Sequence, residues 1–180
     1  MGIPTLIGSA HTASNAASID ITSGIDSTYD EYMFVCTDLN PATDTGKFEF
    51  QVNAVGGSGF NETIMSSWFR TYHNESGSSA DGVEYMLAED QANGTAYQDL
   101  SLGTGNDTDE CTAGILHLFN PSSTTFVKQF YSRFNDYHSS IYSMDLFAGG
   151  YINTTSAIDE ISFKFSNGNM DGVIQMYGIS

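Results

Sequence analysis

The sequence predicts an all-β protein, a two-sheet antiparallel β-sandwich that is jelly-roll-like and has about ten strands. Three observations predict this class. Aromatic residues make up 13% of the chain, and there are 18 glycines but only 3 prolines. Short stretches that alternate between apolar and polar residues recur along the chain with turn residues between them. Aromatic and β-branched residues favour strands, and regularly spaced short strands are typical of sandwiches and barrels.

The chain has the length of one domain, because 180 residues can bury about 70% of the surface of the unfolded chain. Residues 1–17 are small and weakly periodic, and we expect an N-terminal arm that docks along a sheet or onto a neighbouring molecule. Residues 18–180 form the single β-sandwich domain. No disulfide or metal is needed for a chain of this size to fold.

Ten stretches have the period of two that indicates strands. In residues 47–55, for example, Phe48, Phe50 and Val52 share one face and Glu49 and Gln51 the other, so we expect this second face to lie in water. The ten stretches are residues 18–22, 29–37, 47–55, 64–73, 83–87, 114–119, 124–135, 143–153, 161–165 and 173–179.

The chain closes with two strands separated by a turn-rich run. Residues 161–165 alternate, residues 166–172 are rich in Asn, Asp and Gly, and residues 173–179 are apolar. This order predicts a β-hairpin. We expect the final strand to lie inside a sheet, because an apolar edge strand invites aggregation. Residues 89–92, in the least regular part of the chain, are compatible with one helical turn.

The charge balance excludes some partners. Lys and Arg total 5 against 22 Asp and Glu, which gives a formal net charge of −17. Nucleic acid needs a basic surface, and anionic membrane surfaces repel an acidic protein. No stretch has the length and hydrophobicity of a transmembrane helix. We therefore expect a soluble protein that binds neither nucleic acid nor membrane.

Calcium is the one cofactor for which the sequence offers ligands. Asp107, Asp109 and Glu110 lie in one acidic loop, and carboxylate oxygens are the ligands that calcium prefers. The spacing does not match an EF-hand, and the alternative is a solvated turn. A weaker second set is Asp38, Asn40 and Asp44. The four histidines are far apart in sequence and lack the spacing of a zinc motif.

Catalytic motifs are absent from the sequence, and we expect no enzyme activity. It contains no nucleophile elbow, no phosphate-binding loop with Lys and no His-Glu-x-x-His. A glycosidase with paired carboxylates remains as an alternative, since such acids need not be close in sequence. Glu84 and Glu160 are the acids that we name for it.

Trp68 and Tyr72 are the candidate glycan-binding residues, since exposed aromatic rings can stack on sugars. They share a face of the strand at 64–73, so packing in the core is the alternative. A second aromatic pair is Tyr137 and Tyr142. The chain has two cysteines, Cys36 and Cys111, which could form a disulfide; Cys36 also fits a buried small apolar residue.

Four segments carry a resemblance to known proteins: residues 28–34, 50–54, 118–125 and 171–179. They resemble small virion structural proteins of tailed bacteriophages, especially marine and cyanobacterial ones. The resemblance runs from about Ser18 to the C-terminus and includes no catalytic motif. It implies a component of the virion, on the capsid surface or the tail.

Among virion components we favour a capsid decoration or cement protein, and we expect its partners to be copies of itself and other virion proteins. A tail fibre is less favoured, because the sequence has no fibrous repeat or coiled-coil stalk. The alternative is a receptor-binding, carbohydrate-binding module of a tail or tail fibre, with a host-surface glycan as partner. The carbohydrate-binding function requires exposed aromatic side chains at one of the two aromatic pairs, whereas the decoration function does not.

Overall fold

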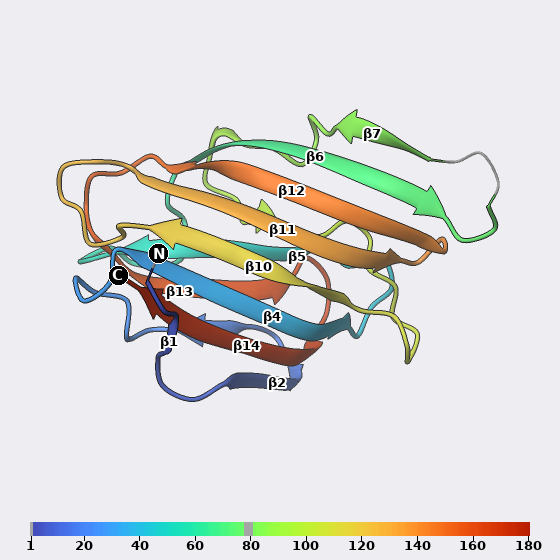
Figure 1. The fold of residues 1–180 in the computed structure, drawn as a ribbon, viewed down its shortest axis with the longest axis horizontal. Helices are drawn as coiled ribbons and strands as arrows, with labels where there is room; N and C mark the ends of the chain where they lie inside the picture. The colour runs from blue at the N-terminus through green and yellow to red at the C-terminus, as the bar shows by residue number, and fades with distance from the viewer. Residues whose placement is uncertain (1, 78–80) are drawn as a thin grey trace.

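The computed structural model describes residues 2–77 and 81–180 and contains two antiparallel sheets packed as a sandwich (Figure 1). The predicted all-β sandwich is confirmed. Met1 of the predicted arm and residues 78–80, between two predicted strands, lie outside the described residues. In the described part of the chain, no helix is long and apolar enough to cross a membrane.

The large sheet has ten strands in the order β1-β14-β4-β10-β11-β12-β6-β7, with β2 also pairing with β14 and β8 with β6. The small sheet has the order β3-β13-β5-β9. The strands of the large sheet are β1 Thr5–Leu6, β2 His11–Ala16, β4 Glu31–Pro41, β6 Ile64–Asn74, β7 Asp81–Tyr85, β8 Ala92–Gly94, β10 Thr112–Phe119, β11 Lys128–His138, β12 Tyr142–Ile152 and β14 Met170–Ile179. Those of the small sheet are β3 Ile19–Ile21, β5 Phe48–Ala54, β9 Gln98–Asp99 and β13 Ile158–Phe165.

Each of the ten predicted strands overlaps one of these elements. The sequence did not predict β1, β2, β8 and β9, which are six residues long or shorter. β1, β8 and β9 have only two or three residues, and β2 (His-Thr-Ala-Ser-Asn-Ala) contains no large apolar residue, so none of the four shows a clear alternation of apolar and polar residues.

The predicted C-terminal hairpin is wrong. β13 pairs with β3 and β5 in the small sheet, whereas β14 pairs with β4 in the large sheet, so the turn-rich run connects the two sheets. The reason is that both strands have an apolar face: Phe163 and Ile174 are fully buried, one in each sheet. The last strand does lie inside a sheet, with β4 on one side and β1 and β2 on the other.

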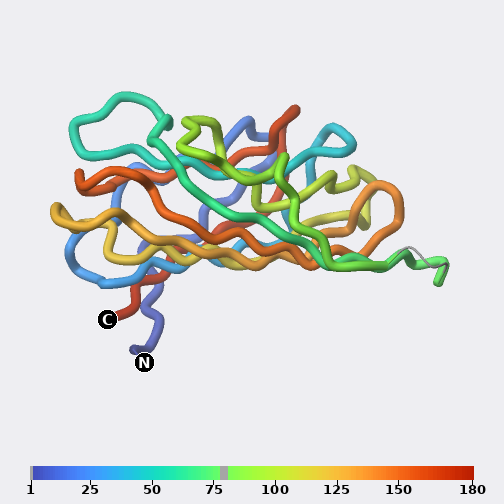
Figure 2. The backbone as a smooth tube through the Cα atoms, turned by 90° about the horizontal axis from the view of Figure 1, so that it is seen from above, coloured from blue at the N-terminus to red at the C-terminus, as the bar shows by residue number. Residues whose placement is uncertain are grey.

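Part of the predicted N-terminal arm extends the large sheet. Thr5 and Leu6 pair with Gly178 and Tyr177, and β2 pairs with the first half of β14. Figure 2 shows the two ends of the chain side by side, projecting beyond the body of the molecule. Residues 2–16 therefore lie beside β14, at one edge of the large sheet.

Aromatic rings from both sheets form the core. Phe163 of the small sheet lies 5.5 Å from Phe34 of the large sheet and stacks on Phe48 at 5.8 Å, with interplanar angles of 57° and 7°. Phe50 meets Phe130 of β11 edge-on at 5.1 Å. These rings have at most 3% of their surface exposed, so they hold the sheets together by burial and by aromatic contacts.

One face of β5 differs from its prediction. We expected the side chains of Glu49, Gln51 and Asn53 to lie in water, but all seven residues of β5 are buried. Residues 86–99, which we call the strap, cover this face. The strap pairs with β6 through β8 and with β5 through β9, so it links the two sheets. The Gln51 side-chain amide donates to the carbonyls of Thr95 and Ala96 at 3.3 and 2.9 Å.

The predicted helical turn at residues 89–92, within the strap, is wrong. Residues 87–89 form a turn, closed by a 3.1 Å hydrogen bond from the Glu89 amide to the Met86 carbonyl, and β8 begins at Ala92. Backbone pairing with two sheets outweighs a short helical preference, because a single helical turn is not stable alone.

The aromatic core makes a direct prediction for stability. Replacing Phe163 by alanine removes a buried ring that touches both sheets, and we expect the free energy of unfolding to fall by about 3–5 kcal/mol. Urea denaturation followed by fluorescence measures this change. Phe126→Ala is the control: Phe126 is 68% exposed, and we expect a change of about 0.5 kcal/mol or less. Equal effects of the two substitutions would contradict this account of the core.

Candidate functional site

The large sheet has one uncovered face. The small sheet packs on its inner face, and none of the described elements covers the outer one (Figure 1). Side chains that alternate with the core residues therefore project from the outer face. One row of them runs across six neighbouring strands, because the register places these residues opposite one another: Val35, Ile115, Arg133, Phe147, Phe69 and Tyr85.

Aromatic stacking orders two groups of side chains on this face. Phe69 and Phe147 stack with ring centroids 4.6 Å apart, and the Arg133 guanidinium lies 5.2 Å from the Phe147 centroid. On the neighbouring part of the face, the rings of His117 and Tyr131 stack at 4.5 Å. A flat face with aligned rings is a surface suited to binding another molecule.

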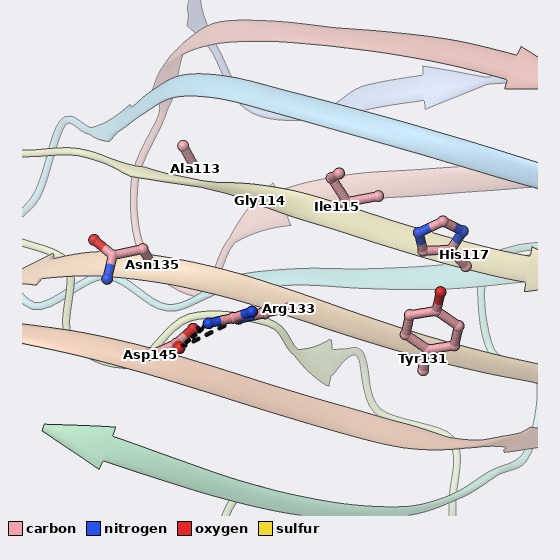
Figure 3. A pocket seen from close by; sticks show the side chains of 8 residues that line it. All are labelled: Ala113, Gly114, Ile115, His117, Tyr131, Arg133, Asn135 and Asp145. Carbon is pink, nitrogen blue, oxygen red and sulfur yellow. Dashed lines mark hydrogen bonds and ion pairs between the residues drawn. The ribbon is translucent and has the colours of Figure 1, made fainter. Parts of the chain in front are cut away.

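A hollow of about 510 Å³ lies between these groups, over β10, β11 and β12. Figure 3 shows the His117 and Tyr131 rings at one end and Asn135 at the other, with the Arg133–Asp145 ion pair beside it. The residues that line it are Ala113, Gly114, Ile115, His117, Tyr131, Arg133, Asn135 and Asp145. We call this feature the outer-face hollow.

The polar groups of the outer-face hollow are held in place by hydrogen bonds. Arg133 donates from Nε to both carboxylate oxygens of Asp145, at 3.0 and 3.2 Å, and from Nη2 to Oδ2 at 2.6 Å. The Asn135 side chain donates to the Met144 carbonyl at 3.1 Å. His117 Nδ1 lies 2.5 Å from a carboxylate oxygen of Glu31. The hollow therefore combines an aromatic end with fixed donors and acceptors.

The predicted glycan-binding pair does not form an exposed platform. Trp68 is fully buried on the inner face of β6, where its indole N–H donates to the Asp99 carbonyl at 3.0 Å. Tyr72, on the same face, is half-buried, and its ring meets Tyr142 edge-on at 6.0 Å. Trp68 is therefore a core residue, as in the alternative from the sequence.

The second aromatic pair is not exposed either. Tyr137 and Tyr142 are both half-buried, and the Tyr137 hydroxyl lies 3.4 Å from a carboxylate oxygen of Glu75. In the predicted strand at residues 124–135, alternation places Tyr131 and Arg133 on one face and Phe130 on the other. It gave no signal for which face would remain uncovered.

In the predicted calcium loop, the Glu110 carboxylate binds the backbone of the loop itself. The Glu110 carboxylate accepts from the Asp107 amide at 2.9 Å and so closes the turn, and Asn40 donates to the Glu110 carbonyl at 2.6 Å. Among the residues that the structure describes, no cluster of three or more His, Cys, Asp or Glu side chains could hold a metal ion. Asp107, Asp109 and Glu110 therefore do not form the predicted calcium site. The weaker set, Asp38, Asn40 and Asp44, has only two carboxylates and stays a prediction.

Two other pairings from the sequence are not formed. Cys36 and Cys111 are both free thiols, because Cys36 points into the core from β4, where Gly114 and Ile174 lie opposite it. Burial raises the pKa of the Cys36 thiol. Glu84 of β7 accepts from Arg70 of β6, whereas Glu160 accepts from Asn53 in the small sheet, so these two acids do not face each other.

A second polar cluster lies at the strap, beside a hollow of about 530 Å³. Lys47 forms ion pairs with Glu89 and with Asp99, the latter at 3.2 Å, and Lys164 lies 3.3 Å from Glu49. Burial, together with a hydrogen bond to Glu89, raises the pKa of Asp99 to about 8. Burial opposes ionisation of Glu89 too, but hydrogen bonds from Asp99 and Lys47 outweigh it and lower the pKa of Glu89. Of these two neighbouring acids, Asp99 is therefore the one that keeps its proton to the higher pH.

Comparisons with family models, with curated proteins and with solved structures find no match to this chain.

The acid cluster predicts a pH dependence of stability. The pKa of Asp99 is about 8 in the folded chain against an ordinary value of 3.8, so the folded state holds a proton that the unfolded state has lost. Its contribution to stability is complete below pH 3.8 and is lost as the pH rises to about 8. We expect Asp99→Asn to flatten the fall in the free energy of unfolding across this range.

Denaturant titrations at several pH values measure this effect. The control is Asp30→Asn, which replaces an exposed acid outside the cluster. It should retain the pH dependence of the wild type. If the Asp99→Asn and wild-type curves stay parallel across the range, the proton is not held by Asp99.

Proposed function

We propose that the protein is a non-enzymatic structural component of a bacteriophage virion, a capsid decoration or cement protein that assembles with copies of itself and with other virion proteins. The observation that carries this proposal is an exposed apolar edge on the large sheet. The resemblance of four sequence segments to virion structural proteins supports the phage context.

The edge is formed by β7, the last strand in the order of the large sheet. Val83, Tyr85 and Leu87 are 74%, 57% and 78% exposed, and on the adjacent β6 Phe69 and Met65 are 41% and 36% exposed. We call these five residues the β7 edge patch. Edge strands are commonly protected by Lys, Pro or a bulge, yet the sequence of β7, Asp-Gly-Val-Glu-Tyr, contains neither Lys nor Pro.

The opposite end of the large sheet also exposes apolar side chains. Leu6 of β1 is 46% exposed, and Ile3, just before it, is 87% exposed. The two ends of the large sheet expose different apolar side chains. This suits a head-to-tail contact, in which β7 of one copy packs against β1 of the next. Contacts of this kind close into rings when the rotation between copies allows it. A ring of identical subunits would suit a repeated position on a particle.

The outer-face hollow favours a second candidate function, a carbohydrate-binding module of a tail or tail fibre. Its stacked rings and fixed polar groups lie over β10, β11 and β12, whereas the β7 edge patch lies on β6, β7 and the start of the strap. In this function Tyr131 replaces Trp68 and Tyr72 as the aromatic contact.

Self-association through the β7 edge patch is testable in solution. We expect the wild-type chain to form an oligomer in size-exclusion chromatography with light scattering. We expect Val83→Lys combined with Leu87→Lys to shift the mass to that of a monomer, because lysines at an edge oppose pairing and apolar burial. Phe126→Lys, at a position that is 68% exposed and outside the patch, is the control. A monomeric wild type, or an oligomer that persists in the double variant, would count against this assembly.

The phage context is tested by immunogold electron microscopy of intact particles from the source culture. We expect label spread over the heads, because a decoration protein is present in many copies there. Label confined to tails or fibre tips would instead favour the second candidate function. Unlabelled particles, under conditions that expose the epitope, would contradict the virion assignment.

A further inference from the structure

We propose that the outer-face hollow binds a saccharide built from neutral pyranose rings, with Tyr131 as the stacking residue. This inference rests on the second candidate function and deepens it, and it is independent of self-association through the β7 edge patch. Its basis is one free aromatic face beside a set of fixed polar groups.

Tyr131 offers that aromatic face. Its side chain is 48% exposed, and on the β10 side its ring is backed by His117 at 4.5 Å and Phe119 at 5.7 Å. On the β12 side the residue directly opposite is Gly149, where an added Cβ would meet nothing closer than 3.9 Å. The residue directly opposite the ring on β12 therefore has no side chain, and Tyr131 itself lines the hollow. The C–H groups of a pyranose carry partial positive charge and suit the negative face of such a ring.

Arg133, Asp145 and Asn135 supply the groups that sugar hydroxyls need. A guanidinium has five N–H donors and a carboxylate about four acceptor sites, and the Arg133–Asp145 pair uses only some of them. Neighbouring hydroxyls on a pyranose act as donor and acceptor in turn. They can therefore bind the carboxylate and the guanidinium side by side.

The charges of the hollow favour a neutral sugar. The only Lys or Arg among the lining residues is Arg133, and the carboxylate of Asp145 already balances its charge. His117 likewise faces the carboxylate of Glu31. An acidic sugar would find no unbalanced cation and would approach a chain whose net charge is −17.

The site is rigid and large enough for one or two sugar rings. Its polar and aromatic groups stand on three adjacent strands, β10, β11 and β12, whose ladders fix their spacing. Groups held on strands lose little freedom when a ligand binds. The volume of about 510 Å³ lies in the range typical of ligand sites.

The test uses the full chain and defined trisaccharides. Saturation-transfer NMR is recorded with maltotriose, cellotriose, mannotriose and triacetylchitotriose as neutral probes, and with sialyllactose and trigalacturonate as acidic ones. We expect at least one neutral probe to receive saturation at its ring C–H protons. Tyr131→Ala should weaken its affinity by about tenfold or more, whereas Tyr131→Phe should preserve it.

Tyr85→Ala is the matched control, because Tyr85 is an exposed tyrosine of the same face that belongs to the β7 edge patch. It should leave saccharide binding unchanged, as should the Val83→Lys, Leu87→Lys double variant. Circular dichroism confirms that each variant is folded. Loss of binding in Tyr131→Ala alone would therefore locate the sugar in the outer-face hollow.

Four outcomes would overturn the proposal. These are no transfer to any neutral probe at about 10 mM, equal binding by wild type and Tyr131→Ala, tighter binding of the acidic probes, and loss of self-association in Tyr131→Ala without any saccharide binding. The last outcome would make the hollow a protein interface. The proposed assembly is tested separately. If only the β7 edge variants lose self-association, the assembly is supported, even when no saccharide binds.

Discussion

The rest of the structure depends on one packing contact, the burial of aromatic rings between a large sheet and a smaller one. Phe163 and Phe48 from the small sheet fill the space beneath Phe34 of the large sheet. A sheet packs against only one face of its partner, and the small sheet has four strands against ten in the large one. The opposite face and the ends of the large sheet are consequently left to solvent or to partners.

The strap shows how a polar segment is built into such a sandwich. It joins β5 of the small sheet to β6 of the large sheet, and it buries Glu49 and Gln51, whose positions in the alternating pattern suggested exposure. Burial of several acids together is tolerated because lysines lie among them and because Asp99 keeps its proton. The same arrangement makes the stability of the fold sensitive to pH.

The large sheet offers two kinds of surface. Its β7 end is apolar and has a free strand edge, which suits another protein chain. Its centre combines the Tyr131 ring with the Arg133–Asp145 pair, which suits a small polar ligand with hydroxyl groups. The two surfaces lie on different strands of one rigid sheet. One surface can therefore bind a protein partner while the other stays accessible.

The sequence by itself determined the fold class and the positions of ten of the fourteen strands of the described chain, since alternation along a strand is a local property. It also put Tyr131 and Arg133 on the face opposite Phe130. Only the tertiary structure decided that Trp68 is buried, that β13 and β14 belong to different sheets, and which face is uncovered. The physical reason is that these outcomes depend on pairing between strands far apart in the chain, on which a local pattern carries no information.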